Sequence, residues 1–75
     1  MTKLRVHLSF IERVGKEELE ISNFNDISLL DYLAILGIKH DEIGMIIADG
    51  RWRHPEDVLI SEHLVIEVFP HLEGG

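Results

Sequence analysis

The hydrophobic pattern of this chain changes its period twice, which limits the folds open to it. Residues 3–11 alternate between apolar and polar, and residues 18–22 do so again. Alternation with period two is typical of β-strands with one buried face. The segment Val14-Gly15-Lys16 lies between them, so the pattern predicts a β-hairpin with a short glycine-containing loop. The side chains expected to face inward are Leu4, Val6, Leu8, Phe10, Leu19 and Ile21.

The pattern then changes to helical spacing. Ser28 is a candidate N-cap, and Asp31 follows three residues later, as in a capping box. Gly37 suits the position that ends a helix. The sequence therefore predicts one amphipathic helix of about three turns, with Phe24 and Ile27 packed at its entry. Its apolar positions are Leu29, Leu30, Leu33, Ala34 and Leu36.

Strand patterns return in the second half. Residues 44–48 are predicted to form a buried strand, and Asp49-Gly50 suits the two-residue type I′ turn of a hairpin. Residues 51–53 begin the return strand, and residues 55–57 form a further loop. Residues 64–69 alternate again, with Ile66 and Val68 on one side, and Pro70 ends this strand because it cannot donate to a sheet.

The order hairpin, helix, strands predicts an α+β domain of the β-grasp, or ubiquitin-like, type. We expect a mixed sheet of four to five strands with one main helix packed on one face. The β-grasp domain is predicted to cover residues 1–70, followed by a flexible C-terminal tail over residues 71–75.

Size, charge and composition restrict the possible functions. A chain of 75 residues has a thin core, and ligand pockets of about 300–1,000 Å³ would remove much of it, so a self-contained enzyme is not expected. The net charge of −7 disfavours nucleic-acid partners. With no cysteine and no metal-ligand spacing among the histidines, disulfides and zinc-thiolate sites are excluded and a metal is not expected. No apolar run approaches the roughly 20 residues of a membrane span, so we expect a cytoplasmic protein with no membrane contact.

The pair Gly74-Gly75 at the end of the predicted tail offers a narrow backbone and a terminal carboxylate. Glycines have no Cβ, so an extended backbone passes through a channel too narrow for side chains. A terminal carboxylate has a pKa of about 3.3–3.7 and is ionised at neutral pH, which makes it a poor acyl donor that needs activation, most simply by adenylation with ATP. Ordering the tail costs about 1–2 kcal/mol per residue, and burial of Phe69 and Leu72 in a partner returns about 1.5–3 kcal/mol each. We therefore predict docking residues at Phe69, Pro70 and Leu72.

Several segments resemble the MoaD/ThiS-type sulfur carriers, especially the small subunit of molybdopterin synthase. They are residues 29–33 with Leu36-Gly37-Ile38, residues 46–51, and Val68-Phe69-Pro70 followed by Gly74-Gly75. The resemblance implies that a ubiquitin-activating-type adenylyltransferase uses ATP to adenylate Gly75. A sulfur donor protein then supplies sulfur for a thiocarboxylate, which serves molybdopterin synthase or, in the thiamine pathway, thiazole synthase. The carrier itself binds no cofactor and is not an enzyme.

The chain departs from the family pattern at two places. His71 replaces a second proline, and Glu73 precedes the glycine pair, which leaves the acceptor enzyme open. Ser61-Glu62-His63 replaces a Gly-Asp turn before the last strand.

Two other functions stay open from the sequence. The first is a ubiquitin-like modifier joined to target lysines through Gly75, which uses the same adenylation. The second is a β-grasp interaction module that binds through its sheet edge or through Trp52. Trp52 is equally suited to packing across strands, and a one-residue change of register would place Phe69 in the core.

Overall fold

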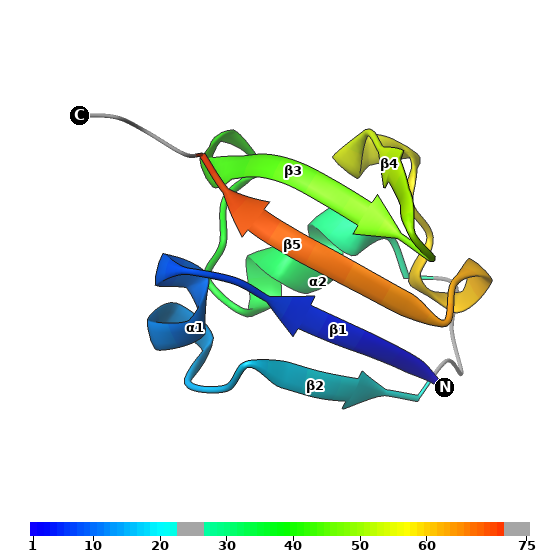
Figure 1. Ribbon diagram of the computed structural model, residues 1–75, viewed down its shortest axis with the longest axis horizontal. Coiled ribbons are helices and arrows are strands. Elements are labelled where there is room, and N and C mark those ends of the chain that lie inside the picture. The colour runs from blue at the N-terminus through cyan, green and yellow to red at the C-terminus, as the bar shows by residue number, and fades with distance from the viewer. Residues whose placement is uncertain (23–26, 72–75) are drawn as a thin grey trace.

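The computed structural model describes residues 1–22 and 27–71, which form a mixed five-stranded sheet with one main helix against one face (Figure 1). The strands are β1 (Thr2–Val6), β2 (Glu18–Ile21), β3 (Ile43–Ala48), β4 (Arg51–Arg53) and β5 (Val65–Pro70). The helices are α1 (Ser9–Val14), α2 (Leu29–Ile35) and the short 3₁₀ turns η1 (His40–Glu42), η2 (Pro55–Asp57) and η3 (Ile60–Glu62). The expected α+β class is confirmed, and so is the expected mixed sheet of four to five strands with one main helix, which has five strands. The predicted packing of Phe24, and the predicted roles of residues 72–75, lie outside the described residues.

The strands lie in the order β2-β1-β5-β3-β4, so β5 occupies the centre of the sheet (Figure 1). The pair β1–β5 is parallel, and the pairs β1–β2, β5–β3 and β3–β4 are antiparallel. The first and last strands are therefore neighbours, and β2 and β4 form the two edges.

The prediction of a single strand over residues 3–11 is wrong after Val6. Leu8 has φ +56° and is 56% exposed, so the alternation ends there and the chain turns into α1. Phe10 is still buried, at 2% exposure, because α1 directs it into the core. Gly15, with φ +88°, caps α1 rather than forming a hairpin loop. The antiparallel pairing of β1 with β2 is as predicted, but a helix connects the two strands.

Helix α2 begins where the sequence predicts. The Ser28 side chain accepts a hydrogen bond from the Asp31 backbone N–H at 3.1 Å, which satisfies one of the free donors at the helix start. The helix has seven residues, about two turns rather than the expected three. Gly37, at φ +88°, turns the chain away from the helix axis immediately after it. Leu29 and Leu33 are fully buried against the sheet.

The core lies between α2, α1 and the inner face of the sheet. Ile66 and Val68, predicted to share one face of the last strand, are both fully buried. The whole buried apolar set consists of Leu4, Val6, Phe10, Leu29, Leu33, Ile38, Ile43, Ile46, Ala48, Val58, Ile60, Ile66 and Val68. The strand members of this set alternate along β1 and β5 and, after the irregularity at Gly44, along β3, so the residues between them face outward on the other side of the sheet.

The β3–β4 turn is tied to the start of β5. Asp49 and Gly50 have φ +51° and +82°, as the predicted type I′ turn requires. The Asp49 carboxylate accepts hydrogen bonds from the backbone N–H groups of Leu64 and Val65 at 2.9 and 3.0 Å, and from His63 Nδ1 at 3.1 Å. The Val65 N–H contributes most to holding the pKa of Asp49 below its ordinary value. Asp49 thus fixes one end of β5 against β3.

Candidate functional site

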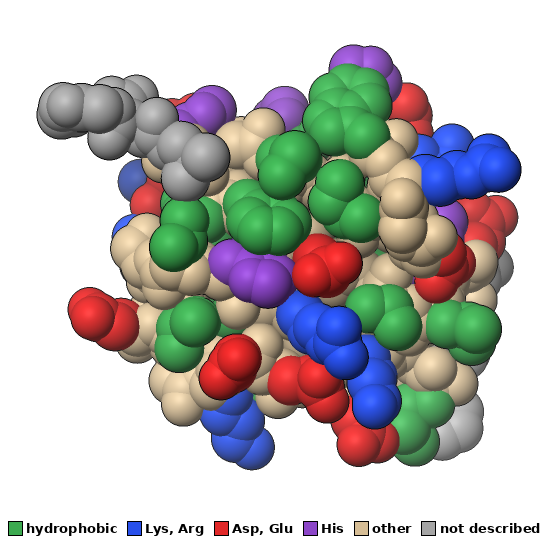
Figure 2. Space-filling model, in the orientation of Figure 1, with side chains coloured by type: hydrophobic (Ala, Val, Ile, Leu, Met, Phe, Trp, Pro, Cys, Tyr) green, Lys and Arg blue, Asp and Glu red, His purple; other side chains and the backbone are tan. Residues whose placement is uncertain are grey.

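The face of the sheet opposite α2 carries two kinds of surface. Hydrophobic side chains gather over β3, β4 and β5, and charged side chains over β1 and β2 (Figure 2). Since α2 and α1 supply the inner layer, this outward face has no covering element among the described residues. It is called the open face below.

The apolar half of the open face consists of Met45, Ile47, Trp52 and Phe69, called the open-face patch. Phe69 lies opposite Met45, and Trp52 lies opposite Ile47, so the four residues form two cross-strand pairs. Trp52 is 56% exposed, and the other three are half-buried. The Trp52 indole packs edge to face against the His54 ring, with ring centroids 4.5 Å apart. Trp52 therefore takes part in cross-strand packing and still presents a large apolar surface.

The boundary between the two halves is formed by His7. Its ring stacks on Phe69, with centroids 4.1 Å apart and planes 3° from parallel. His7 Nε2 also lies 3.2 Å from a carboxylate oxygen of Glu67, a hydrogen bond that the ring donates. The stack covers one side of Phe69 and directs the phenyl ring over the sheet. Phe69 is thus an outward residue of β5, as the burial of Val68 beside it requires.

The charged half pairs its own side chains. Arg5 Nε donates to Glu18 Oε1 at 3.0 Å, and Lys3 Nζ lies 3.9 Å from Glu18 Oε2. Glu20 lies opposite Lys3 in the ladder. These charges are balanced across the strand pair and exposed to water, so this half has little apolar surface to bury against a partner.

The end of β5 meets β3 at the root of the predicted tail. Pro70 pairs with Ile43, and His71 Nε2 donates to the Asp41 carbonyl oxygen at 3.0 Å. A hollow of about 200 Å³ opens here, beside the open-face patch; it is lined by Gly44, Met45, Phe69, Pro70 and His71.

The η1 turn that accepts this contact is itself held by a charge pair. Arg13 of α1 donates to both carboxylate oxygens of Glu42, at 3.0 and 2.8 Å, and to the Gly37 carbonyl at 3.0 Å. The Lys39 N–H also donates to Glu42. The Arg13 guanidinium, followed by the Lys39 N–H, lowers the pKa of Glu42 to about 2. The carbonyl that holds His71 therefore belongs to a segment fixed on both sides.

The predicted site residues are only partly within the described residues. Phe69 lies on the open face and Pro70 ends β5 next to it, so the structure brings these two together at one corner of the patch. Leu72, Gly74 and Gly75 lie outside the described residues. The sequence alone does not indicate the contributions of His7, Met45 and Ile47, nor that the backbone of Pro70 and His71 passes close to Gly44. A glycine inside an apolar strand pattern often marks a place where another backbone comes close, and Gly44 is such a glycine.

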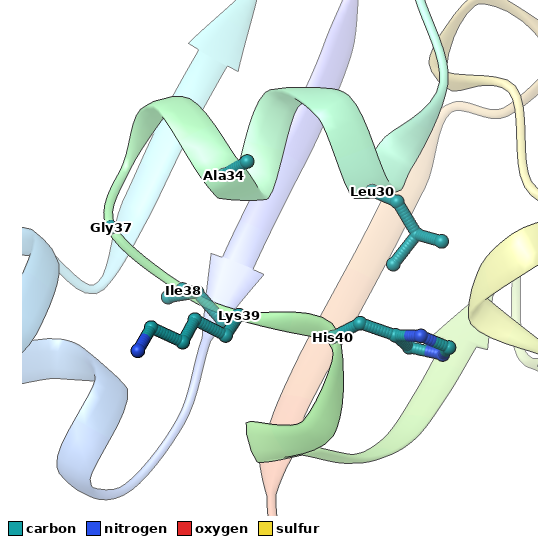
Figure 3. Close-up of a pocket in the computed structure, with 6 residues that line it drawn as sticks. All are labelled: Leu30, Ala34, Gly37, Ile38, Lys39 and His40. Atoms are coloured by element: carbon teal, nitrogen blue, oxygen red, sulfur yellow. The ribbon is translucent and has the colours of Figure 1, made fainter.

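A second hollow lies on the helix side of the molecule. This groove of about 300 Å³ is lined by Leu30, Ala34, Gly37, Ile38, Lys39 and His40 (Figure 3). The side chains of Lys39 and His40 point in different directions (Figure 3). His40 Nε2 lies 3.5 Å from a carboxylate oxygen of Glu56, which is not among the lining residues. The lining has no paired acid, base or nucleophile, so it offers no arrangement for catalysis.

Over residues 1–22 and 27–71, no group of three or more histidine, aspartate or glutamate side chains is arranged to hold a metal ion. Within the same ranges, none of the helices has the length and apolar character of a membrane span. Comparison with family models, curated proteins and solved structures finds no match to this chain.

Proposed function

We propose that this chain has the β-grasp fold and acts as a sulfur carrier whose Gly75 carboxylate is activated by a partner enzyme. The observation that carries the proposal is the position of the tail root at a corner of the open-face patch. A partner that covers Met45, Ile47, Trp52 and Phe69 would receive the chain leaving His71 at the edge of the same contact.

The strand order supports the proposed β-grasp fold. A sheet ordered β2-β1-β5-β3-β4, with β1 and β5 parallel and the connection from β2 to β3 carrying the main helix, is the arrangement expected of ubiquitin-like proteins. The resemblance of residues 46–51 and 68–70 to the sulfur carriers falls on β3, the β3–β4 turn and the end of β5.

In the proposed chemistry, the Gly75 carboxylate is the chain's own reacting group, and ATP, the persulfide and the reducing thiol come from partners. A Gly75 carboxylate oxygen attacks the α-phosphorus of ATP, and pyrophosphate leaves. The persulfide of a sulfur donor protein then attacks the acyl carbon, expels AMP and forms an acyl disulfide. A thiol reduces that disulfide, which releases the thiocarboxylate and leaves a disulfide on the donor side. The chain contributes the carboxylate, a narrow diglycine and the docking surface, and ATP stays with the activating partner.

The thiocarboxylate is proposed to serve a synthase, with molybdopterin synthase favoured over thiazole synthase by the Phe69-Pro70 sequence. The acidic charge of the chain suits association with a basic partner by electrostatic steering. A cytoplasmic location, with ATP and thiols available, belongs to the same proposal.

Mass spectrometry of the C-terminal peptide tests the function. The chain is incubated with ATP, the host's activating enzyme and a sulfur donor, and the peptide ending in Gly75 is then analysed before and after alkylation. We expect exchange of one terminal oxygen for sulfur, with alkylation at that sulfur. Alkylation separates this product from oxidised Met1 or Met45, whose mass is nearly the same. The matched control is the chain without Gly75.

An unchanged C-terminal peptide would overturn the sulfur-carrier proposal. Conjugates to lysines of other proteins would instead identify a ubiquitin-like modifier. The exposure of Trp52 favours a third outcome, a binding module, in which partner binding survives removal of the glycine pair.

A further inference from the structure

Gly44 lies in β3 opposite the point at which the backbone leaves β5. Ile43 pairs with Pro70 and Met45 pairs with Phe69, so two steps along β3 correspond to one along β5. Gly44 is the extra residue of this β-bulge. Bulges bend a strand and alter where its neighbour goes, and this one lies at the root of the predicted tail.

The glycine is required here for space. A Cβ at position 44 would lie 2.5 Å from the Pro70 carbonyl oxygen and 2.8 Å from both the Pro70 carbonyl carbon and the His71 Cα. These are backbone atoms, which cannot rotate away as a side chain can. The φ angle of Gly44 is outside the left-handed region, unlike that of Gly15, Gly37 and Gly50. Alanine at position 44 would be compatible with the local backbone, so any damage from it comes from pushing residues 70–71 away.

A second contact acts on the same segment from the other side. The His71 ring donates to the Asp41 carbonyl, and the Arg13–Glu42 pair holds the turn that carries this carbonyl. Together, the close approach at Gly44 and the bond from His71 fix the first residue after β5 in two directions.

We propose that Gly44 is a positioning residue, which with His71 sets the direction in which the chain leaves β5 toward Gly74-Gly75. The inference rests on the proposed function, because the direction matters only if a partner holds the open-face patch while it acts on the tail. In that arrangement the patch fixes the carrier and the root fixes the starting point of the tail. A displacement of about 1 Å in a reacting group costs on the order of 10²-fold in rate.

The first measurement concerns the contact itself. In the full-length chain, NMR is expected to show a strong nuclear Overhauser effect between the α protons of Gly44 and His71. Gly44→Ala is expected to remove the corresponding contact and shift the His71 resonances. His71→Ala leaves the Gly44 backbone in place and removes only the bond to Asp41. Wild-type spectra without this contact would overturn the inference, and so would Gly44→Ala with residues 70–71 unmoved.

The second measurement is carrier-dependent ATP–pyrophosphate exchange by the activating enzyme. For Gly44→Ala we expect kcat to fall about tenfold or more while the carrier's KM changes less than about twofold. His71→Ala, which keeps the fold without a steric conflict, is expected to lower kcat several-fold. Gly50→Ala is the matched control: it strains a left-handed glycine in the β3–β4 turn, at the other end of β3, and should leave kcat unchanged.

The outcomes separate the two proposals. If the wild-type chain supports no exchange, the proposed function fails. If the wild-type chain is active and both Gly44→Ala and His71→Ala match its kcat, the positioning role fails and the function stands. A loss of kcat in Gly50→Ala equal to that in Gly44→Ala would also overturn the positioning role, because general destabilisation would then explain both.

Discussion

The two halves of the open face belong to one sheet, yet their outward side chains differ: one half pairs charges, and the other pairs apolar groups. On β1 and β2, Lys3 and Arg5 face Glu18, and opposite charges satisfy one another. On β3, β4 and β5, the corresponding positions carry two apolar cross-strand pairs that leave Trp52 largely exposed.

The difference indicates where a partner would gain free energy. Exposed ion pairs are worth about 0–1 kcal/mol and are already formed, so covering them gains little. Exposed aromatic surface gains about 25 cal/mol per Å² when it is removed from water. The tail root lies on the apolar half, so the proposed docking and the proposed tail chemistry would fall on the same side of His7.

The largest expected effect is on the apolar half. Phe69→Ala removes an outward ring from the patch, and we expect affinity for the activating enzyme to fall by about 1.5–3 kcal/mol, or about 10- to 150-fold. Calorimetric titration measures this change. Ile35→Ala is the control, because Ile35 is 76% exposed on α2, away from the open face. Equal losses in both variants would break the comparison between the halves.

Asp49→Ala tests how firmly the strands under the apolar half are held. Removing an acceptor for the Leu64 and Val65 N–H groups is expected to lower the free energy of unfolding by about 1–3 kcal/mol. Because the folded state lowers the pKa of Asp49 from its ordinary 3.8, its charged form contributes fully above that value. The difference from wild type should therefore shrink as pH falls from about 5 to 2. Urea unfolding across that range measures it, with the exposed Asp57→Ala as control.

His7→Ala tests how much the residue at the boundary between the halves contributes to stability. Loss of the ring stacked on Phe69 is expected to lower the free energy of unfolding by about 0.5–1.5 kcal/mol. His7→Phe keeps a stacked ring and loses the bond to Glu67. Its stability, measured by thermal unfolding, should therefore be close to that of the wild type. Equal destabilisation by both variants would show that the Glu67 bond matters more than the stack.

The smallest effect is expected on the charged half. Arg5→Ala breaks the exposed pair with Glu18 and should change the free energy of unfolding by about 0.2–1 kcal/mol, less at high salt. Affinity for the activating enzyme should stay within about twofold of wild type. A tenfold loss of affinity would mean that the partner uses the charged half as well.

Local signals in the sequence predicted local structure accurately. Ser28 caps α2 and Asp49-Gly50 forms the left-handed turn, because both depend on chemistry within a few residues. The alternation of Ile66 and Val68 correctly placed Phe69 outward. The failure at residues 9–14 has an equally local cause: Phe10 continues the period-two pattern of β1, yet a helical turn after Leu8 buries it just as well.

The features that depend on distant partners were not predictable. Nothing near His7 in the sequence indicates that its ring stacks on Phe69, because β1 and β5 meet only in the folded sheet. The fit of Gly44 against Pro70 depends on the register between β3 and β5. Of the candidate site, the residue types at Phe69 and Pro70 were predictable, whereas the patch and the anchored root required the three-dimensional structure.

The central position of β5 has a consequence for how the chain folds. Leu4 pairs with Ile66, so the parallel contact in the middle of the sheet joins segments from opposite ends of the described chain. Folding must close that long loop before the contact forms, so we expect the chain to fold more slowly than small helical bundles. A fragment that stops before Val65 would leave β1 and β3 without a shared neighbour. The strand that precedes the proposed reactive tail is therefore also the one that completes the core, and chains that lack it should be open to proteolysis.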